Sequence, residues 1–290
     1  MARRRPPTRH GLVIVDKPAG MTSHDVVAML RKRLGEKRIG HAGTLDPDAT
    51  GVLLVGVGYV TRLMKLLSGL DKRYTAEVVL GVTTSTLDDS GEVTGRFDMA
   101  HVSLDDVRAA ARSLTGSIMQ VPPMVSALKV DGKRLHELAR EGVEVERQAR
   151  PVTVHHFTVE PTSEELVFLV DVSVSSGTYV RSLAADLGTA LGGGAHLRKL
   201  RRHSIGPFDE SESAPIDSAQ LLPAIEALRL VQKISVDDET ARLVANGRRL
   251  PKFEGEGPWA LVNQRGALIG VYELVDGEAV PEVVLAEPVL

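Results

Sequence analysis

The sequence predicts a mixed α/β protein. Two observations carry this prediction: apolar runs rich in β-branched residues recur along the chain, and segments with helical spacing of apolar residues separate several of them. The chain has 290 residues, of which 43% are hydrophobic, and this is enough to bury a sizeable core. We therefore expect a globular protein with one large domain and a small appended unit.

The composition limits the chemistry that the protein can perform. The chain has no cysteine, which excludes disulfides, thiol catalysis, iron–sulfur clusters and cysteine zinc sites. Any nucleophile is therefore an oxygen or a nitrogen. No apolar run approaches the roughly 18 residues that cross a bilayer, and residues 1–10 lack the apolar core of a secretory signal. The expected location is the cytoplasm, without membrane contact.

Strand predictions begin with residues 11–16, a buried apolar run that ends in a turn at residues 17–20. Residues 72–80 carry β-branched and aromatic residues at their centre, and residues 166–175 alternate apolar and polar residues. Residues 83–100 are polar, acidic and contain glycine, which predicts a loop or a ragged hairpin. The remaining predicted strands are residues 52–57, 126–130, 151–160, 196–205, 259–262, 268–272 and 283–285.

Helix predictions follow from capping residues and helical spacing. Ser23 is the expected N-cap of a helix that ends before Gly35. Residues 103–106 are typical of a capping box, which opens a helix that ends near residue 116. Further helices are expected at residues 61–67, with Thr61 as the cap, at 133–141, at 179–191, within 211–234 and at 238–246.

Charge and composition divide the chain into parts. Residues 1–10 form a basic extension that we expect to be disordered, and residues 11–234 form the large domain. The composition changes after residue 207, and residues 235–290 are expected to form a small separate unit. The proline-broken stretch at about residues 124–151 is predicted to be an insertion that can act as a flap.

The most unusual stretch is residues 40–51, GHAGTLDPDATG, which is dense in glycine, small residues and carboxylates and precedes a buried-type strand. A carboxylate before proline is held out of the helical region, and Gly43 nearby lets another molecule approach. Asp46 therefore suits the role of a fixed nucleophile. The dipeptide alone favours an ordinary turn, however. Asp48 offers a second carboxylate, and paired acids suggest glycosidic chemistry.

Other candidates supply a charge and planar surfaces. Arg181 lies near the start of a predicted helix and could keep a carboxylate ionised, although a plain surface arginine is the alternative. Tyr74 and Tyr179 are two of only four tyrosines, and a base-binding site needs planar side chains. Either tyrosine could instead belong to the core. His41 could flank a pocket or stack on a base, or be a structural histidine.

The basic residues are segregated along the chain, although the net charge is only -3. A single basic run is usually solvated surface, whereas several runs beside candidate motifs favour a phosphate-backbone footprint. In sequence, the last of these runs has no acidic residue close by. The clusters are Arg3, Arg4, Arg5 and Arg9; Arg31, Lys32, Arg33, Lys37 and Arg38; and Arg198, Lys199, Arg201, Arg202 and His203.

Further motifs accompany the Asp46 stretch in a fixed order. They are residues 16–23 (DKPAGMTS), 71–74 (DKRY), 123–129 (PMVSALK), 176–182 (SGTYVRS) and 194–202 (GAHLRKLRR). Together with residues 40–51, they closely resemble the motifs of the TruB family, the bacterial tRNA pseudouridine-55 synthases. The resemblance covers about residues 11–208, and the shared order argues against coincidence.

The resemblance implies a fold and a reaction. The fold is a pseudouridine synthase core with a mixed, mainly antiparallel sheet, an inserted thumb at about residues 124–151 and a small PUA-like RNA-binding domain at residues 235–290. The reaction isomerises a uridine in the T loop of tRNA by breaking its N-glycosidic bond, rotating the uracil and rejoining it through carbon. The base has to leave its stack first, at a cost of a few kcal/mol.

The resemblance also assigns roles to matching residues. Asp46 matches the nucleophile, Tyr74 the tyrosine that stacks on the base and assists proton transfer, and Arg181 the arginine that pairs with the aspartate. Leu200 matches an apolar wall of the uracil pocket, and Tyr179 matches a packing aromatic. The other positions expected to contact the substrate are His41, which takes the space of the flipped base, and Lys17, Gly43, Lys72, Arg73, Arg198 and Arg202.

No cofactor or metal is expected, because no His/Asp/Glu spacing resembles a metal site and no glycine pattern matches a P-loop or dinucleotide fingerprint. The expected partner is the T-arm of tRNA, bound by a monomer without an obligate protein partner. Two alternatives stay open on the sequence alone. One is a tRNA-binding or tRNA-folding protein in which modification is secondary, and the other is a nucleosidase that uses Asp46 with Asp48.

Overall fold

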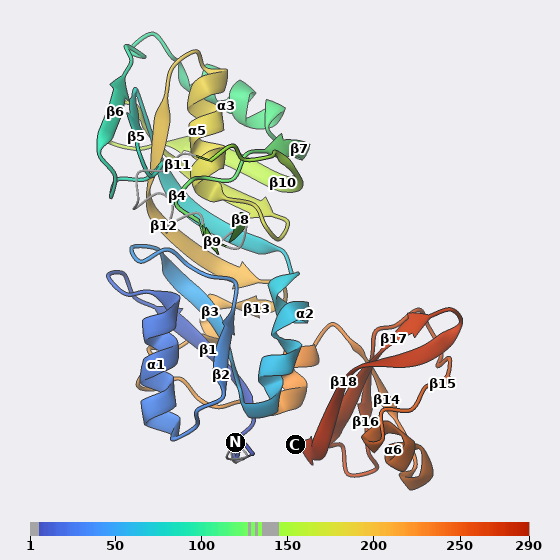
Figure 1. Ribbon diagram of the computed structural model, residues 1–290. Coiled ribbons are helices and arrows are strands. Elements are labelled where there is room, and N and C mark those ends of the chain that lie inside the picture. Colours follow the sequence, from blue (N-terminus) through green and yellow to red (C-terminus); the bar gives the residue numbers. More distant parts are fainter. Residues whose placement is uncertain (1–5, 127–128, 131–132, 135–144, 290) are drawn as a thin grey trace. The chain divides into compact units, whose positions relative to one another are not determined.

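The computed structural model describes residues 6–126, 129–130, 133–134 and 145–289 (Figure 1). The chain divides into two compact units. We call residues 6–47, 51–68 and 207–289 the terminal unit, and residues 48–50 and 69–206 the central unit. Strands joined by helices make up both units, which confirms the predicted mixed α/β class.

The first strands of the terminal unit form an antiparallel sheet beneath one helix. Strand β1 (Gly11–Lys17) pairs with β3 (Thr50–Val57), and β2 (Ile39–Ala42) pairs with the other edge of β3. Helix α1 (Ser23–Leu34) packs its apolar face against β1 and β3 in one buried core. The 3-10 helix η1 (Gly58–Leu63) and the short helix α2 (Met64–Ser68) follow β3.

Two predicted caps in this unit are wrong by a few residues. The N-cap of α1 is Thr22, whose hydroxyl accepts the Asp25 N–H while the Asp25 carboxylate accepts the Thr22 N–H. Thr22 wins over Ser23 because only Thr22 has an acid three residues later, as a capping box requires. Thr61 lies inside η1, where its hydroxyl donates to the Gly58 carbonyl at 2.7 Å.

The central unit contains a sheet of long antiparallel strands. Strand β4 (Lys72–Leu80) lies between β11 (Val167–Val174) and β12 (Ala195–Ile205). Beyond β11 come β10 (Arg150–Pro161) and then β7 (Gly116–Gln120). The predicted sheet is therefore confirmed as mainly antiparallel, whereas β7 was not predicted.

Helices and hairpins surround this sheet (Figure 1). Helix α3 (Leu104–Ser113) opens with the predicted capping box of Ser103 and Asp106 and packs on β10, while α5 (Val180–Ala190) packs on β12. Residues 83–100 contain the hairpin of β5 (Val82–Thr84) and β6 (Val93–Arg96).

Part of the predicted insertion falls outside the described residues. Strands β8 (Lys129–Val130) and β9 (Lys133–Arg134) pair as a hairpin. The strand prediction is confirmed at residues 129–130, whereas Ser126 is not in a strand and residues 133–134 are not helical. The rest of the helix predicted at 133–141 lies outside the described residues, as do residues 1–5 of the basic extension.

Short elements connect the large domain to the C-terminal sheet. They are β13 (Phe208–Asp209), η2 (Glu210–Glu212) and η3 (Ala224–Leu228). The α-helix predicted within 211–234 is therefore wrong, because the helical segments there are 3-10 turns and strand β14 begins at Gln232. Pro215 and Pro223 interrupt this stretch and remove backbone donors that an α-helix needs.

The C-terminal sheet has the strand order β14, β16, β17, β18, β15. It covers its buried Trp259 and Tyr272 with helix α6 (Asp238–Ala245). No helix among the described residues is long and apolar enough to cross a membrane. The strands are β14 (Gln232–Ser235), β15 (Leu250–Pro251), β16 (Trp259–Val262), β17 (Leu268–Val275) and β18 (Glu278–Val289).

Candidate active site

The loop that carries Asp46 leaves β2 at Ala42 and is anchored on both sides of the aspartate. The Ser23 hydroxyl accepts the Leu45 N–H at 2.9 Å and donates to the Leu45 carbonyl at 3.2 Å. On the other side, the Gly20 N–H donates to the Pro47 carbonyl at 3.0 Å. The backbone on both sides of Asp46 is therefore fixed, as a positioned nucleophile requires.

The two carboxylates of this loop differ in exposure. Asp46 is half-buried, whereas Asp48 is exposed. Gly43 has a φ of 74°, a left-handed conformation that a residue with a Cβ adopts only with strain. The backbone itself therefore favours glycine at position 43, while the access for another molecule that the sequence suggests stays a prediction.

Lys17 ties the first strand to the same loop. Its ammonium is fully buried and donates to three backbone carbonyls, those of Pro18 at 2.8 Å, Met21 at 2.7 Å and Pro47 at 2.9 Å. These acceptors match the donor capacity of an ammonium group. The contacts are those of a residue that positions the Asp46 loop, and the substrate contact predicted for Lys17 remains untested.

His41 lies on β2, a few residues before the Asp46 turn, and is partly buried. Its ring meets the ring of His24 from α1 edge to face, with the centroids 5.1 Å apart. The predicted role of His41 beside a flipped base therefore has to be compatible with a ring that already packs on α1.

Strand β4 presents Tyr74 and its neighbours to opposite faces of the central sheet. Lys72 and Tyr74 are buried on one face, while Arg73 is exposed on the other because side chains alternate along a strand. Arg73 forms a two-point ion pair with Asp171 of β11, at 3.1 and 2.7 Å. Arg73 therefore lies on the other face of the sheet from Tyr74, and the substrate contact predicted for Arg73 stays a prediction.

A buried arginine accompanies Tyr74. Arg202 of β12 is opposite Tyr74 in the strand register, is 1% exposed and places its guanidinium carbon 6.0 Å from the centre of the tyrosine ring. Burial lowers the pKa of Lys72 to about 8, and repulsion from Arg202 acts in the same direction against the attraction of Asp71. Tyr74 thus lies on the sheet face that carries these two buried basic residues.

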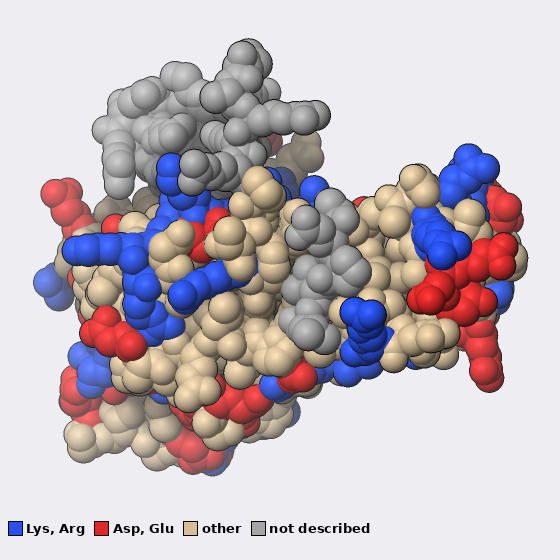
Figure 2. All heavy atoms as spheres, turned by 90° about the horizontal axis from the view of Figure 1, so that it is seen from below, with Lys and Arg blue, Asp and Glu red and all other residues tan. Residues whose placement is uncertain are grey.

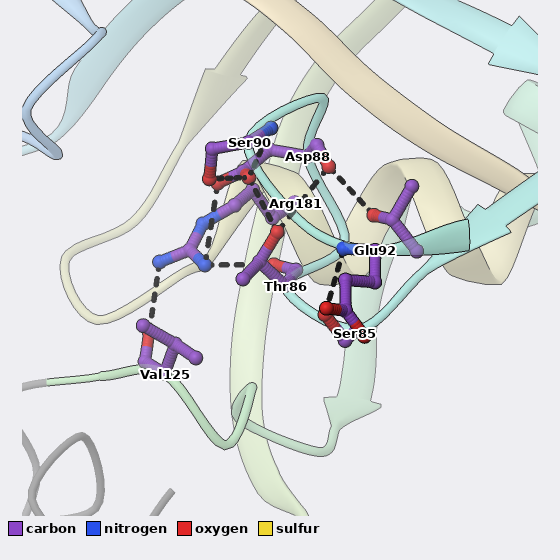
Figure 3. Close-up of polar contacts among 8 residues, drawn as sticks. Ser85, Thr86, Asp88, Ser90, Glu92, Val125 and Arg181 are labelled. Carbon is purple, nitrogen blue, oxygen red and sulfur yellow. Dashed lines mark hydrogen bonds and ion pairs between the residues drawn. The ribbon is translucent and has the colours of Figure 1, made fainter. Parts of the chain in front are cut away.

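The start of α5 holds Arg181, which is 4% exposed (Figure 3). Its guanidinium donates to the carbonyls of Thr86 at 2.8 Å and Val125 at 2.9 Å, and lies 3.5 Å from a carboxylate oxygen of Asp88. The other oxygen of Asp88 accepts the hydroxyls of Thr86 and Ser90, both at 2.6 Å. The arginine is therefore fixed by partners from several loops.

Sequence reasoning missed Asp88. The residue lies in the polar stretch 83–100, and nothing in that stretch indicates which cation its carboxylate meets. The only local signal is the Asp88 and Ser90 spacing, typical of an Asx turn, which predicts the turn but not the partner. The pairing of Arg181 with Asp46 that the resemblance implies stays a prediction.

The third basic cluster is paired in the structure with acids that are distant in sequence. Arg198 bonds to Glu77 of β4 and to Glu164, the latter at 2.6 Å, and Lys199 donates to Glu77 at 2.9 Å. Burial acts to raise the pKa of Glu77, but the bonds from Lys199 and Arg198 outweigh it, so the net shift is downward.

Leu200 lies where β12 bulges. Lys199 has a φ of 53°, and the pairing with β4 shifts register between Arg198 and Arg201. Leu200 is partly buried. A bulge redirects side chains locally, so the apolar wall predicted at Leu200 depends on a feature that the sequence pattern does not reveal.

Comparison with known families adds a decisive observation. A model of the TruB family pseudouridylate synthase N-terminal domain matches residues 31–180, more than half of the chain. The chain belongs to the TruB family. A model of the tRNA pseudouridylate synthase B C-terminal domain matches residues 181–229 of this TruB chain. The predicted family is confirmed, and with it pseudouridine synthase activity.

Relatives support the TruB assignment over nearly the whole chain. A tRNA pseudouridine synthase B of Thermobifida fusca is 46% identical and covers 95% of this chain and 98% of its own length. One of Corynebacterium aurimucosum is 45% identical, with 98% of both chains covered. In a crystal structure of a Cbf5-Nop10-Gar1 complex, one chain is similar with a TM-score of 0.70 and 26% identity, over 96% of this chain and 84% of that chain.

Proposed function

We propose that this TruB protein isomerises uridine 55 in the T loop of tRNA to pseudouridine, with Asp46 as the nucleophile. The observation that carries the proposal is the anchoring of the backbone on both sides of Asp46, by Ser23 at Leu45 and by Gly20 and Lys17 at Pro47. The relatives named tRNA pseudouridine synthase B support tRNA as the substrate.

The reaction needs a fixed carboxylate, a planar surface and a charge that keeps the carboxylate ionised. In the proposed mechanism, the target base leaves its stack and lies against Tyr74, and Asp46 promotes cleavage of the N-glycosidic bond. The uracil then rotates and rejoins the sugar through carbon, while Tyr74 assists proton transfer. Arg181 would hold Asp46 ionised, since an adjacent cation favours the charged carboxylate.

The remaining substrate contacts are part of the same proposal. Leu200 and Tyr179 would line the uracil pocket, and His41 and Gly43 would border the flipped base. Lys72, Arg198 and Arg202 are proposed RNA contacts, although burial of Arg202 and the acidic partners of Arg198 weaken the case for direct phosphate binding. The enzyme would act as a monomer in the cytoplasm on the T-arm of its tRNA.

The family assignment does not favour the two alternatives from the sequence. A nucleosidase would release free uracil and depend on both loop carboxylates. A tRNA-folding protein with secondary modification would keep its main activity without Asp46. Both alternatives predict outcomes that the experiment below distinguishes from base isomerisation.

The test is Asp46→Asn, with Asp48→Asn as the matched control on the same loop. Loss of a nucleophile should lower pseudouridine formation in an unmodified tRNA transcript by at least about 10³-fold, while tRNA binding is retained. Asp48→Asn should keep near wild-type turnover, because Asp48 is exposed. Mapping of pseudouridine and an assay for free uracil decide the outcome. Appreciable turnover by Asp46→Asn would show that Asp46 is not the nucleophile and would contradict the proposal.

A further inference from the structure

The segment that follows β7 is fastened to the first turn of α5 through one buried side chain. Gln120, the last residue of β7, is 2% exposed. Its Nε2 donates to the Tyr179 carbonyl at 3.2 Å, and its Oε1 accepts the Tyr179 N–H at 2.8 Å. The amide thus engages both backbone polar groups of a single residue.

Tyr179 is the residue at which α5 begins. It occupies the N-cap position with φ of -102° and ψ of 111°, and its carbonyl accepts the first helical hydrogen bond, from Leu183, at 3.1 Å. Ser, Thr, Asp and Asn are preferred at this position because their side chains bond to the first turn, and tyrosine does not share this property. Tyr179 cannot cap α5 with its own side chain. The Gln120 amide, which lies outside the helix, therefore fixes the start of α5.

Two further bonds join the same two segments. The Ser182 hydroxyl donates to the Val121 carbonyl at 2.9 Å, and the Arg181 guanidinium donates to the Val125 carbonyl at 2.9 Å. The backbone from Gln120 to Val125 therefore runs along the first turn of α5. Of these contacts, only the Gln120 amide holds the helix backbone itself.

We propose that Gln120 is a positioning residue for the isomerisation. By fixing the backbone of Tyr179, it sets the start of α5 and hence the place from which Arg181, two residues later, extends its guanidinium. The inference rests on the proposed roles of Tyr179 and Arg181. A helix start that shifts by about 1 Å would displace both side chains, and a misplacement of that size costs about 10²-fold in rate.

The decisive variant is Gln120→Met, because methionine is also unbranched and fills a similar space but forms no strong hydrogen bond. We expect the single-turnover rate on tRNA to fall roughly 10- to 100-fold, with the dissociation constant for tRNA changed less than twofold. Amide hydrogen exchange in residues 179–183 should accelerate. Hydrogen exchange does not depend on catalysis. It therefore tests the hydrogen bonds between Gln120 and Tyr179 even if the proposed reaction itself proves wrong.

A second variant adds a pH signature. In Gln120→Glu, an ionised carboxylate would face the Tyr179 carbonyl and could not donate, whereas the protonated acid could donate and restore the pair. The rate of this variant relative to wild type should therefore rise as the pH falls from 8 to about 5.5, since burial raises the pKa of a carboxyl group. A side chain that only fills space would show no such recovery.

Ser103→Ala is the control for stability. Removing this N-cap of α3 should cost about 1 kcal/mol and lower the melting temperature without changing the rate. If Gln120→Met behaves in the same way, with a lower melting temperature and a wild-type rate, Gln120 only stabilises the fold and the inference is wrong. Unchanged hydrogen exchange in residues 179–183 would overturn it as well.

Discussion

Lys72 is a buried ammonium group whose charge depends on pH near neutrality. Its side chain is 7% exposed, and burial lowers its pKa to about 8 with a further contribution from Arg202. A lysine in the unfolded chain titrates near 10.4. Between these two values the unfolded chain holds a proton that the folded protein has released.

The free energy of unfolding should therefore rise with pH from about 8 to about 10.4 through this residue, and its contribution is lowest below pH 8. Relative to Lys72→Met, wild type should gain about 2 kcal/mol between pH 7 and 9.5. Urea unfolding at both pH values measures the difference. Lys65→Met, at a side chain that is 85% exposed, is the control and should show no gain. A parallel pH dependence of wild type and Lys72→Met would contradict the prediction.

Single residues differ in how far the sequence predicts them. Asp46 and Arg181 are predicted as site residues because they lie in motifs that are contiguous in sequence, and their roles stay predictions. The sequence does not identify Asp88 and Gln120, because the role of each depends on a contact with a residue far along the chain. Arg181 is 93 positions from Asp88, and Tyr179 is 59 positions from Gln120. Such partners are chosen by packing of the sheet and helices, and no local pattern encodes them.

At the scale of elements, the Asp46 loop depends on the strand and turn before it. Lys17 ends β1, and its ammonium connects the turn at Pro18 and Met21 to Pro47 in the loop. Hydrogen bonds from a charged donor contribute about 1.5–3 kcal/mol each. Lys17 therefore adds one charge-assisted bond to Pro47, beside the bond from Gly20, and links the loop to the turn before α1.

Lys17→Met should displace this loop because the Pro47 carbonyl loses its bond to the ammonium group, and the turn at Pro18 and Met21 loses its link to the loop. We expect pseudouridine formation to fall about 10²-fold, together with a lower melting temperature. Lys65→Met, at a lysine of α2 that is 85% exposed and lies outside the basic clusters, should leave both quantities unchanged. Single-turnover kinetics and thermal unfolding provide the measurements. A wild-type rate in a folded Lys17→Met enzyme would show that the loop keeps its position without the ammonium group.

Element boundaries were predicted best where local chemistry decides them. The capping box of Ser103 and the strand at Lys72–Leu80 were correct, because caps and β-branched runs are local signals. The prediction failed at β7 and in residues 211–234. Strand β7 has little apolar alternation and owes its pairing to β10, and residues 211–234 contain Pro215 and Pro223, which remove backbone donors that an α-helix needs.

For the whole molecule, the distribution of charge bears on how tRNA is bound. On the face drawn in Figure 2, lysine and arginine side chains are interspersed with carboxylates and do not form one continuous basic surface. The basic clusters predicted from sequence differ in whether their charges are already bonded to other groups of the protein. Arg198 and Lys199 are paired with glutamates, and Arg33 bonds to the carbonyls of Ile216 and Ala219.

Lys37 and Arg38 retain the character expected of a phosphate contact. Both are exposed, and the Arg38 guanidinium lies 5.8 Å from the ring centre of Tyr59, which also has Arg62 at 5.4 Å. An aromatic ring carries no net charge, so a cation–π contact does not neutralise these cations as a carboxylate would. We therefore expect these residues, and not the paired cluster on β12, to carry the salt-dependent part of tRNA binding.

The test compares two double variants with the same change in charge. Lys37→Gln with Arg38→Gln should weaken tRNA binding and reduce the slope of log affinity against log salt by roughly one unit for each phosphate that the variant no longer neutralises. Arg198→Gln with Lys199→Gln should change the slope little, because these charges are already neutralised by Glu77 and Glu164. It should instead lower stability, since Glu77 would lose the bonds that lower its pKa while remaining largely buried.

Equal slopes for both variants would show that exposure of a basic side chain does not decide whether it contacts phosphate. A larger effect of the β12 variant would show that the cluster on β12 contacts the phosphates, as the sequence first suggested.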